Sequence, residues 1–220
     1  MERKTEVTAT MTSALLWVVW LGLVGYAFLG APPDQPETLE LIQRLIRFQV
    51  DGINPLIVAL FNLMGVWPGI YAGVLLTDGR GQKIPAWPFV AGSFALGAFA
   101  LLPYLALRRP YREWSGSESW LLRVWNSRIL GAIWLVLTVG FLGYGLSQGS
   151  WSDWWQAFQT NRFIHVMSCD FVLLCLLFPL GLWDDMVRRR VHLTPWFALV
   201  SLVPMVGAAI YLTLRPPLPD

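Results

Sequence analysis

The chain carries at residues 161–185 the stretch NRFIHVMSCDFVLLCLLFPLGLWDD, which decides its fold class. The apolar run inside it is close to the roughly 20 residues that an α-helix needs to cross the hydrocarbon core of a bilayer. His165, Cys169 and Asp170 interrupt this run. Ionisable side chains in lipid are costly and are usually functional. The stretch therefore predicts a membrane-spanning helix that carries a candidate functional site.

The whole chain has the composition of a multi-pass membrane protein. Of its 220 residues 55% are hydrophobic and 14% are charged, and the mean hydropathy is +0.52, which is unlike a water-soluble domain. Backbone groups in lipid must be satisfied internally, and the alternation typical of barrel strands is absent. We expect an all-α polytopic integral membrane helical bundle, a single domain over residues 1–220, with six spans at 14–30, 55–76, 86–107, 129–147, 163–183 and 195–214.

The segments around the first span have two further interpretations. Arg3 and Lys4 precede residues 14–30 as in a secretory signal, but this run is rich in aromatic residues and lacks the small residue expected before a cleavage site. We therefore interpret it as a retained anchor. Residues 37–50 combine a capping signal with helical periodicity, which predicts an amphipathic helix lying in the membrane interface.

Basic residues predict the orientation of the chain. Ten arginines follow the first, third and fifth predicted spans, whereas six Lys or Arg lie in the terminal segments and the other loops. Because cytoplasmic loops are enriched in Lys and Arg, this distribution predicts that both termini lie on the lumenal or outer face. The net charge of +2 gives no indication of a nucleic-acid partner, so membrane lipid is the expected surrounding.

Asp170 and Asn62 form the candidate intramembrane polar site. Counted along the helical rise, each lies about 10 Å from the end of its predicted span, and the two approach the midplane from opposite sides. A carboxylate at a helix centre costs roughly 2.5–3.5 kcal/mol, which a partner or a proton reduces. Two interpretations stay open: a functional polar site, or a buried polar latch between helices.

His165 and Asn62 are the candidate pigment ligands. His165 lies near one end of its span, where it is either an interfacial histidine or an axial ligand to the metal of a chlorophyll or haem. No second histidine or carboxylate accompanies it at metal-ligand spacing, so no protein metal site is predicted. Cys169 and Cys175, the only cysteines, are too far apart along one helix to form a disulfide.

A glycine face characterises the second predicted span. Gly65, Gly69 and Gly73 repeat every four residues and form one smooth side of the helix, next to Pro68, which should kink it. This face serves either close helix packing or the binding of a flat pigment ring. No internal repeat with matching broken helices is evident in the sequence, which argues against a transporter.

Short segments of the chain carry a resemblance to a known family. They are FNLMG at 61–65, LLTDGR at 75–80, IPAWPF at 84–89, NRFIHV at 161–166, CDF at 169–171 and DDM at 184–186. These segments resemble an uncharacterised family of multi-pass membrane proteins of cyanobacteria and chloroplasts. The resemblance implies a photosynthetic membrane, thylakoid or cytoplasmic, and no defined chemistry. The cysteines are not a feature of that family, and Asp184 often corresponds to asparagine there.

Two functions are compatible with these features. The first is an accessory or assembly protein of the photosynthetic membrane that binds chlorophyll or carotenoid and docks on a photosystem or another large complex. The alternative is a small membrane enzyme or transporter that uses Asp170 with Asn62. No phosphate loop, nucleophile elbow or metalloprotease helix supports a defined catalytic activity.

Overall fold

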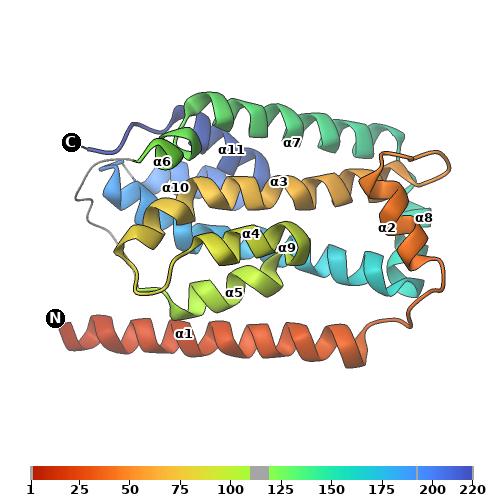
Figure 1. Cartoon of the computed structure of the whole chain (residues 1–220), viewed down its shortest axis with the longest axis horizontal. Helices are drawn as coiled ribbons and strands as arrows, with labels where there is room; N and C mark the ends of the chain where they lie inside the picture. Colours follow the sequence, from red (N-terminus) through yellow and green to blue (C-terminus); the bar gives the residue numbers. More distant parts are fainter. Residues whose placement is uncertain (1, 110–118, 192, 220) are drawn as a thin grey trace.

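The computed structural model describes residues 2–109, 119–191 and 193–219, and all regular structure within these ranges is helical (Figure 1). Four helices are long and apolar enough to cross a membrane: α1 (Glu2–Gly25) continued by the π-helix η1 (Tyr26–Gly30), α3 (Pro55–Asp78), α7 (Arg128–Gln148) and α9 (Arg162–Arg188). The all-helical class is confirmed. The predicted number of six spans is not.

The third and sixth apolar runs are each broken into two short helices. Gly97, with a φ of 51°, separates α4 (Trp87–Leu96) from α5 (Ala98–Leu107). Val203 separates α10 (Leu193–Leu202) from α11 (Pro204–Leu214), which starts with a proline that has no N–H to donate. A helix of ten residues is about 15 Å long, half the hydrocarbon thickness. None of these short helices is therefore long enough to cross a bilayer by itself.

Each pair of short helices is a hairpin that enters and leaves the bundle at the same end. At the start of the first hairpin, a Cβ on Gly79 would lie 2.7 Å from the Cβ of Ala86, and at its close Arg108 Nη1 lies 3.0 Å from Asp78 Oδ1. The second hairpin closes with Arg215 Nη1 3.0 Å from Asp185 Oδ2. In a bilayer both hairpins are re-entrant, with their backbone covered by the long helices.

The two ends of the bundle differ in character. The end where Asp78, Arg108, Asp185 and Arg215 meet is called the arginine end, and both chain termini lie there (Figure 1). The other end carries α2 (Thr38–Ile46) and α8 (Trp151–Thr160) and is called the interfacial end. Helix α2 falls within the predicted interfacial segment. A further short helix, α6 (Trp120–Trp125), precedes α7 at the arginine end.

The fold is an internal duplication that the sequence analysis missed. A long helix, an interfacial helix, a second long helix and a hairpin follow one another in residues 2–107 and again in residues 128–214. Packing repeats as well: α5 lies on α1 as α11 lies on α7, and α4 lies on α3 as α10 lies on α9. Because both hairpins start from the arginine end, the two halves have the same orientation, as in parallel transporter repeats.

The duplication is visible in matching residues once the helices are aligned. LGLVGY at 21–26, at the end of α1 and the first residue of η1, corresponds to VGFLGY at 139–144 in α7, and YLALR at 104–108 corresponds to YLTLR at 211–215. The matching residues of α3, α5 and their counterparts lie 107 positions apart, as Asp78 and Asp185 do. Asn54 and Asn161 also correspond, and each side chain caps the helix that follows it, α3 or α9.

Candidate functional site

A buried cluster of arginines and aspartates occupies the arginine end. In the first half, Asp78 accepts hydrogen bonds from Tyr104 Oη at 2.8 Å and from Arg108 Nη1 at 3.0 Å. Arg188 Nη1, from the second half, also lies 3.2 Å from this carboxylate. Tyr104 lies in α5, and Arg108 follows one helical turn later, just after the helix ends. Together they fix the first hairpin to the end of α3.

The second half repeats this arrangement at corresponding positions. Asp185 accepts from Tyr211 Oη at 2.9 Å and from Arg215 Nη1 at 3.0 Å, so the second hairpin is fixed to α9 as the first is to α3. Arg189 Nε adds a bond of 3.0 Å to the same oxygen. Asp184 joins the halves, because its Oδ2 accepts from Arg108 Nη1 at 2.9 Å.

Each charge of this cluster lies within 3.5 Å of an opposite charge, and four guanidinium groups share the three carboxylates of Asp78, Asp184 and Asp185. Burial by itself lowers the pKa of Arg108, but the carboxylates of Asp78 and Asp184 more than offset this, so the pKa is raised and the guanidinium stays charged. Buried ion pairs add little net stability, whereas removing one partner is costly. The cluster therefore specifies where the two hairpins close.

Asp170, the residue singled out from the sequence, is buried at the tip of the first hairpin. Its Oδ1 accepts a hydrogen bond of 2.8 Å from the backbone N–H of Ala98, the first residue of α5. The first N–H groups of a helix have no partner within that helix, and in a bilayer core no water replaces one. Asp170 supplies this partner from α9, which is the contact expected of a polar latch between helices.

Asn62 is not joined to Asp170 within the part of the chain that the structure describes. Its Nδ2 donates a hydrogen bond of 2.8 Å to the carbonyl of Val58 in its own helix, α3. The residue that approaches the hairpin tip from α3 is Met64, whose Cε would lie 3.0 Å from a Cβ on Gly97. The structure thus places the two candidate residues in separate interactions.

His165 is buried, and both of its ring nitrogens are engaged. Nδ1 lies 2.7 Å from the carbonyl oxygen of Phe158, so this nitrogen carries the proton, because a carbonyl only accepts. Nε2 lies 2.7 Å from Tyr26 Oη and accepts from that hydroxyl. The Phe158 ring stacks on the imidazole with centroids 4.1 Å apart. The lone pair that would bind a pigment metal is used within the protein.

The glycine face of α3 packs against other helices over part of its length. A Cβ on Gly69 would lie 2.3 Å from the Trp134 ring of α7, and one on Gly73 would lie 3.3 Å from Leu212 of α11. No atom lies within 4 Å of a Cβ built on Gly65. Helix packing accounts for two of the three glycines, and Gly65 is open.

An apolar groove of about 510 Å³ lies between α7 and α9, on the half of the bundle nearer the interfacial end. Four residues of α3 form its floor, and α8 covers it with three aromatic rings. It is called the lateral groove and is lined by Leu56, Ala59, Leu60, Leu63, Leu142, Gly145, Leu146, Trp151, Trp154, Phe158, Ser168, Cys169, Phe171 and Val172. Cys169 lines the groove, whereas Cys175 does not, and both thiols are free.

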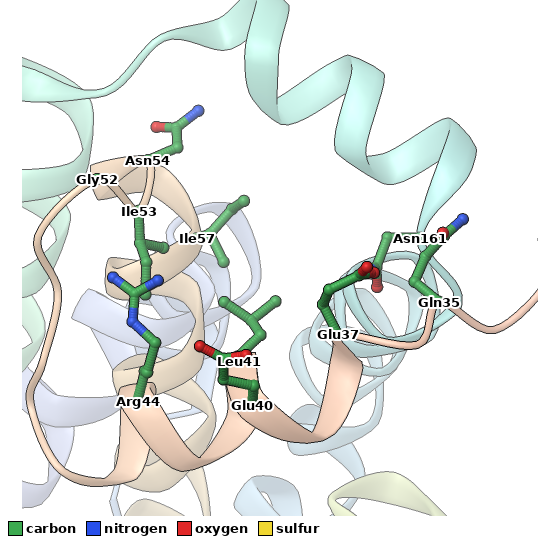
Figure 2. A pocket seen from close by; sticks show the side chains of 10 residues that line it. All are labelled: Gln35, Glu37, Glu40, Leu41, Arg44, Gly52, Ile53, Asn54, Ile57 and Asn161. Carbon is green, nitrogen blue, oxygen red and sulfur yellow. The ribbon is translucent and has the colours of Figure 1, made fainter.

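A polar pocket of about 420 Å³ lies beneath α2 at the interfacial end, and Figure 2 shows its ten lining residues. The Asn54 and Asn161 amides serve here as helix caps, and Gln35 Nε2 donates to Thr160 O at 2.9 Å. Arg44 donates to the carbonyl of Asp51. These bonds join the segment before α2 to the end of α8 and join α2 to the loop that follows it, which gives the pocket a structural explanation.

Sequence reasoning missed the residues that fix the hairpins, although a signal was present. Tyr-x-x-x-Arg occurs twice, at Tyr104 and Tyr211, each time at the end of an apolar run.

Within the described ranges, no group of three or more His, Cys, Asp or Glu residues has the geometry to hold a metal ion. Comparison of the chain with protein-family models, curated proteins and solved structures finds no match.

Proposed function

We propose that this chain is an accessory protein of a photosynthetic membrane that docks on a larger complex through its two outermost helices, α1 and α7. The observation that carries the proposal is that α1 and α7, which are corresponding helices of the two halves, both have an exposed apolar face. Val18 of α1 and Val136 of α7 occupy corresponding positions and are 65% and 70% exposed. Both faces are apolar and lie at membrane depth, where the neighbours are lipid or other helices.

Small residues on these faces support a helix partner rather than lipid alone. Gly22 and Gly25 of α1, and Gly140 and Gly143 of α7, have no atom within 4 Å of a built Cβ. Small residues at membrane helix surfaces let a second helix approach closely and gain van der Waals contact. The segments around 61–89 and 161–186 that resemble the cyanobacterial and chloroplast family support a photosynthetic membrane as the location.

Filling the glycine positions of α7 should abolish docking. Gly140→Leu combined with Gly143→Leu is expected to move the protein from a larger complex to its own mass, because the added side chains keep a partner helix away. The measurement is migration of the tagged protein, solubilised in digitonin, on a native gel. Gly65→Leu is the matched control, since that glycine is open too but belongs to α3. Co-migration that survives the α7 substitutions would disprove the proposal.

We propose that the arginine end faces the cytoplasm or stroma. The sequence analysis predicted lumenal termini by counting Lys and Arg in the loops between six spans. With four spans and two hairpins, different loops lie on the same side of the membrane, so the count changes. Three basic residues lie at the interfacial end, Arg44, Arg47 and Arg162. The described basic residues at the arginine end are Arg3, Lys4, Arg80, Lys83, Arg108, Arg109, Arg123, Arg128, Arg188, Arg189, Arg190 and Arg215. The excess favours a cytoplasmic arginine end.

Thiol labelling tests this orientation. In sealed membranes isolated with the cytoplasmic or stromal face outward, Lys83→Cys at the arginine end is expected to react with a membrane-impermeant maleimide, whereas Asp34→Cys at the interfacial end reacts only after the membrane is permeabilised. Both positions are exposed, and the native cysteines lie within α9. Labelling of Asp34→Cys in the sealed membranes, with Lys83→Cys protected, would reverse the assignment.

A carrier is the second candidate, and the duplication favours it. Transporters place their sites at the tips of broken helices in corresponding positions of two repeats. Here Gly97 and Val203 mark such tips, and Asp170 is a buried carboxylate beside the first. A carrier that depends on proton exchange at Asp170 requires the carboxylate itself, whereas a latch requires only an acceptor for the Ala98 N–H.

A further inference from the structure

The second hairpin fills the space between α7 and α9 in only one half of the membrane. In the other half, no helix among the described residues lies between them. Helix α11 packs against both α7 and α9, and its 11 residues extend about 16 Å from the arginine end. The lateral groove continues between the same two helices toward the interfacial end. Its floor on α3, from Leu56 to Leu63, covers a further rise of about 12 Å. The groove therefore has the depth of one bilayer leaflet.

We propose that the lateral groove binds one acyl chain of a membrane lipid from the leaflet at the interfacial end. A volume of about 510 Å³ falls within the range of small-molecule binding sites. Helix α11 packs between the same two helices in the other half of the membrane, which suits a chain that ends near the midplane. An elongated molecule that spans both leaflets does not fit within this depth, since the bilayer core is about 30 Å thick.

The lining chemistry matches a hydrocarbon chain. Aliphatic residues form the floor, and the one hydroxyl, Ser168 Oγ, donates its hydrogen bond to Ile164 O at 2.7 Å. The other polar groups of the lining are the Cys169 thiol and the indole N–H groups of Trp151 and Trp154, which lie on α8 at the interfacial end, where a lipid headgroup or ester can accept from them. The nearest imidazole, His165, has both nitrogens engaged, so the groove offers no histidine ligand to a chlorophyll metal.

The groove is accessible from the lipid and covered toward the water. Leu146 of α7 and Val172 of α9 are 57% and 54% exposed, so its two walls open toward the membrane. Above it, Trp151 and Trp154 meet edge to face at 5.8 Å, and Trp154 stacks with Phe158 at 5.4 Å. Tryptophan is suited to the depth where chains meet headgroups. A lipid thus enters sideways while its headgroup stays beside α8.

Filling the groove tests the proposal. Cys169→Trp places an indole into the cavity, and Leu176→Trp makes the same change about two turns further along the same face of α9, at an exposed position outside the groove. After washing in detergent, native mass spectrometry of the wild type and of Leu176→Trp is expected to show one retained lipid. The Cys169→Trp variant is expected to lose it. Equal retention by both variants, or a carotenoid or quinone retained in place of a lipid, would overturn the inference.

The two native cysteines provide a second measurement that does not depend on a bulky substitution. In a Cys175→Ala background, delipidation is expected to accelerate the reaction of Cys169 with an apolar maleimide, because the chain no longer covers the thiol. In a Cys169→Ala background, the reaction of Cys175 is expected to stay the same, because that residue lies outside the groove. A Cys169 rate that does not respond to added phospholipid contradicts the proposal even if Cys169→Trp misfolds.

Discussion

Replacing Asp185 with asparagine is expected to lower the free energy of unfolding by about 3–5 kcal/mol, the cost of removing one partner from a buried ion pair. The Asp185 side chain is fully buried and lies 3.0 Å from both Arg189 and Arg215. Asparagine still accepts a hydrogen bond, but it leaves the guanidinium charges without a counter-charge in a low dielectric. Thermal unfolding in detergent micelles measures the loss.

Two control substitutions separate charge from hydrogen bonding. Tyr211→Phe removes one hydrogen bond to Asp185 and keeps every charge, so about 1 kcal/mol is expected. Asp153→Asn removes an exposed carboxylate from α8 and is expected to change stability by about 0.5 kcal/mol or less. Because Asp78 occupies the corresponding position in the first half, Asp78→Asn should resemble Asp185→Asn. If Asp185→Asn costs no more than Asp153→Asn, the cluster does not hold the hairpin.

Hydropathy predicted the long helices well because length and apolarity decide them. The runs at 55–76, 129–147 and 163–183 lie within α3, α7 and α9, and Asn54 caps α3 as its position before Pro55 indicates. The same criterion failed at 86–107 and 195–214. A run of 20 apolar residues has the same composition whether it forms one helix or two, and the break depends on a single backbone angle at Gly97.

The site was predicted in part, for a related reason. The sequence identified Asp170 as a costly buried carboxylate, and it is buried. Its partner is the backbone N–H of Ala98, which exists as an unpaired donor only because the helix is broken there. A search for side-chain partners therefore reached Asn62 instead. The Tyr104–Arg108 and Tyr211–Arg215 pairs are recognisable in the sequence. The aspartate that each pair binds, Asp78 or Asp185, is brought next to it only by the fold.

The break at Gly97 should be the position least tolerant of a methyl group. Gly97 has a φ of 51°, and a Cβ there would lie 1.8 Å from Asp170 Oδ2. Backbone strain alone costs about 1–3 kcal/mol, and the clash adds to it. Gly97→Ala is therefore expected to destabilise the protein by more than Gly65→Ala, where no atom lies within 4 Å of the new methyl group. Detergent unfolding transitions compare the two.

A double-mutant cycle of Asp170→Ala and Gly97→Ala shows whether the Asp170 contact and the helix break at Gly97 contribute to stability together or independently. Asp170→Ala alone leaves the Ala98 N–H without its acceptor and is expected to cost about 1–3 kcal/mol. In that background Gly97→Ala no longer meets the carboxylate, so its cost should fall, and the two effects should not add. Strict additivity would mean that Asp170 does not hold the hairpin tip. Asp170→Asn keeps an acceptor and should stay near wild-type stability, so a loss of function in this variant alone would favour the carrier.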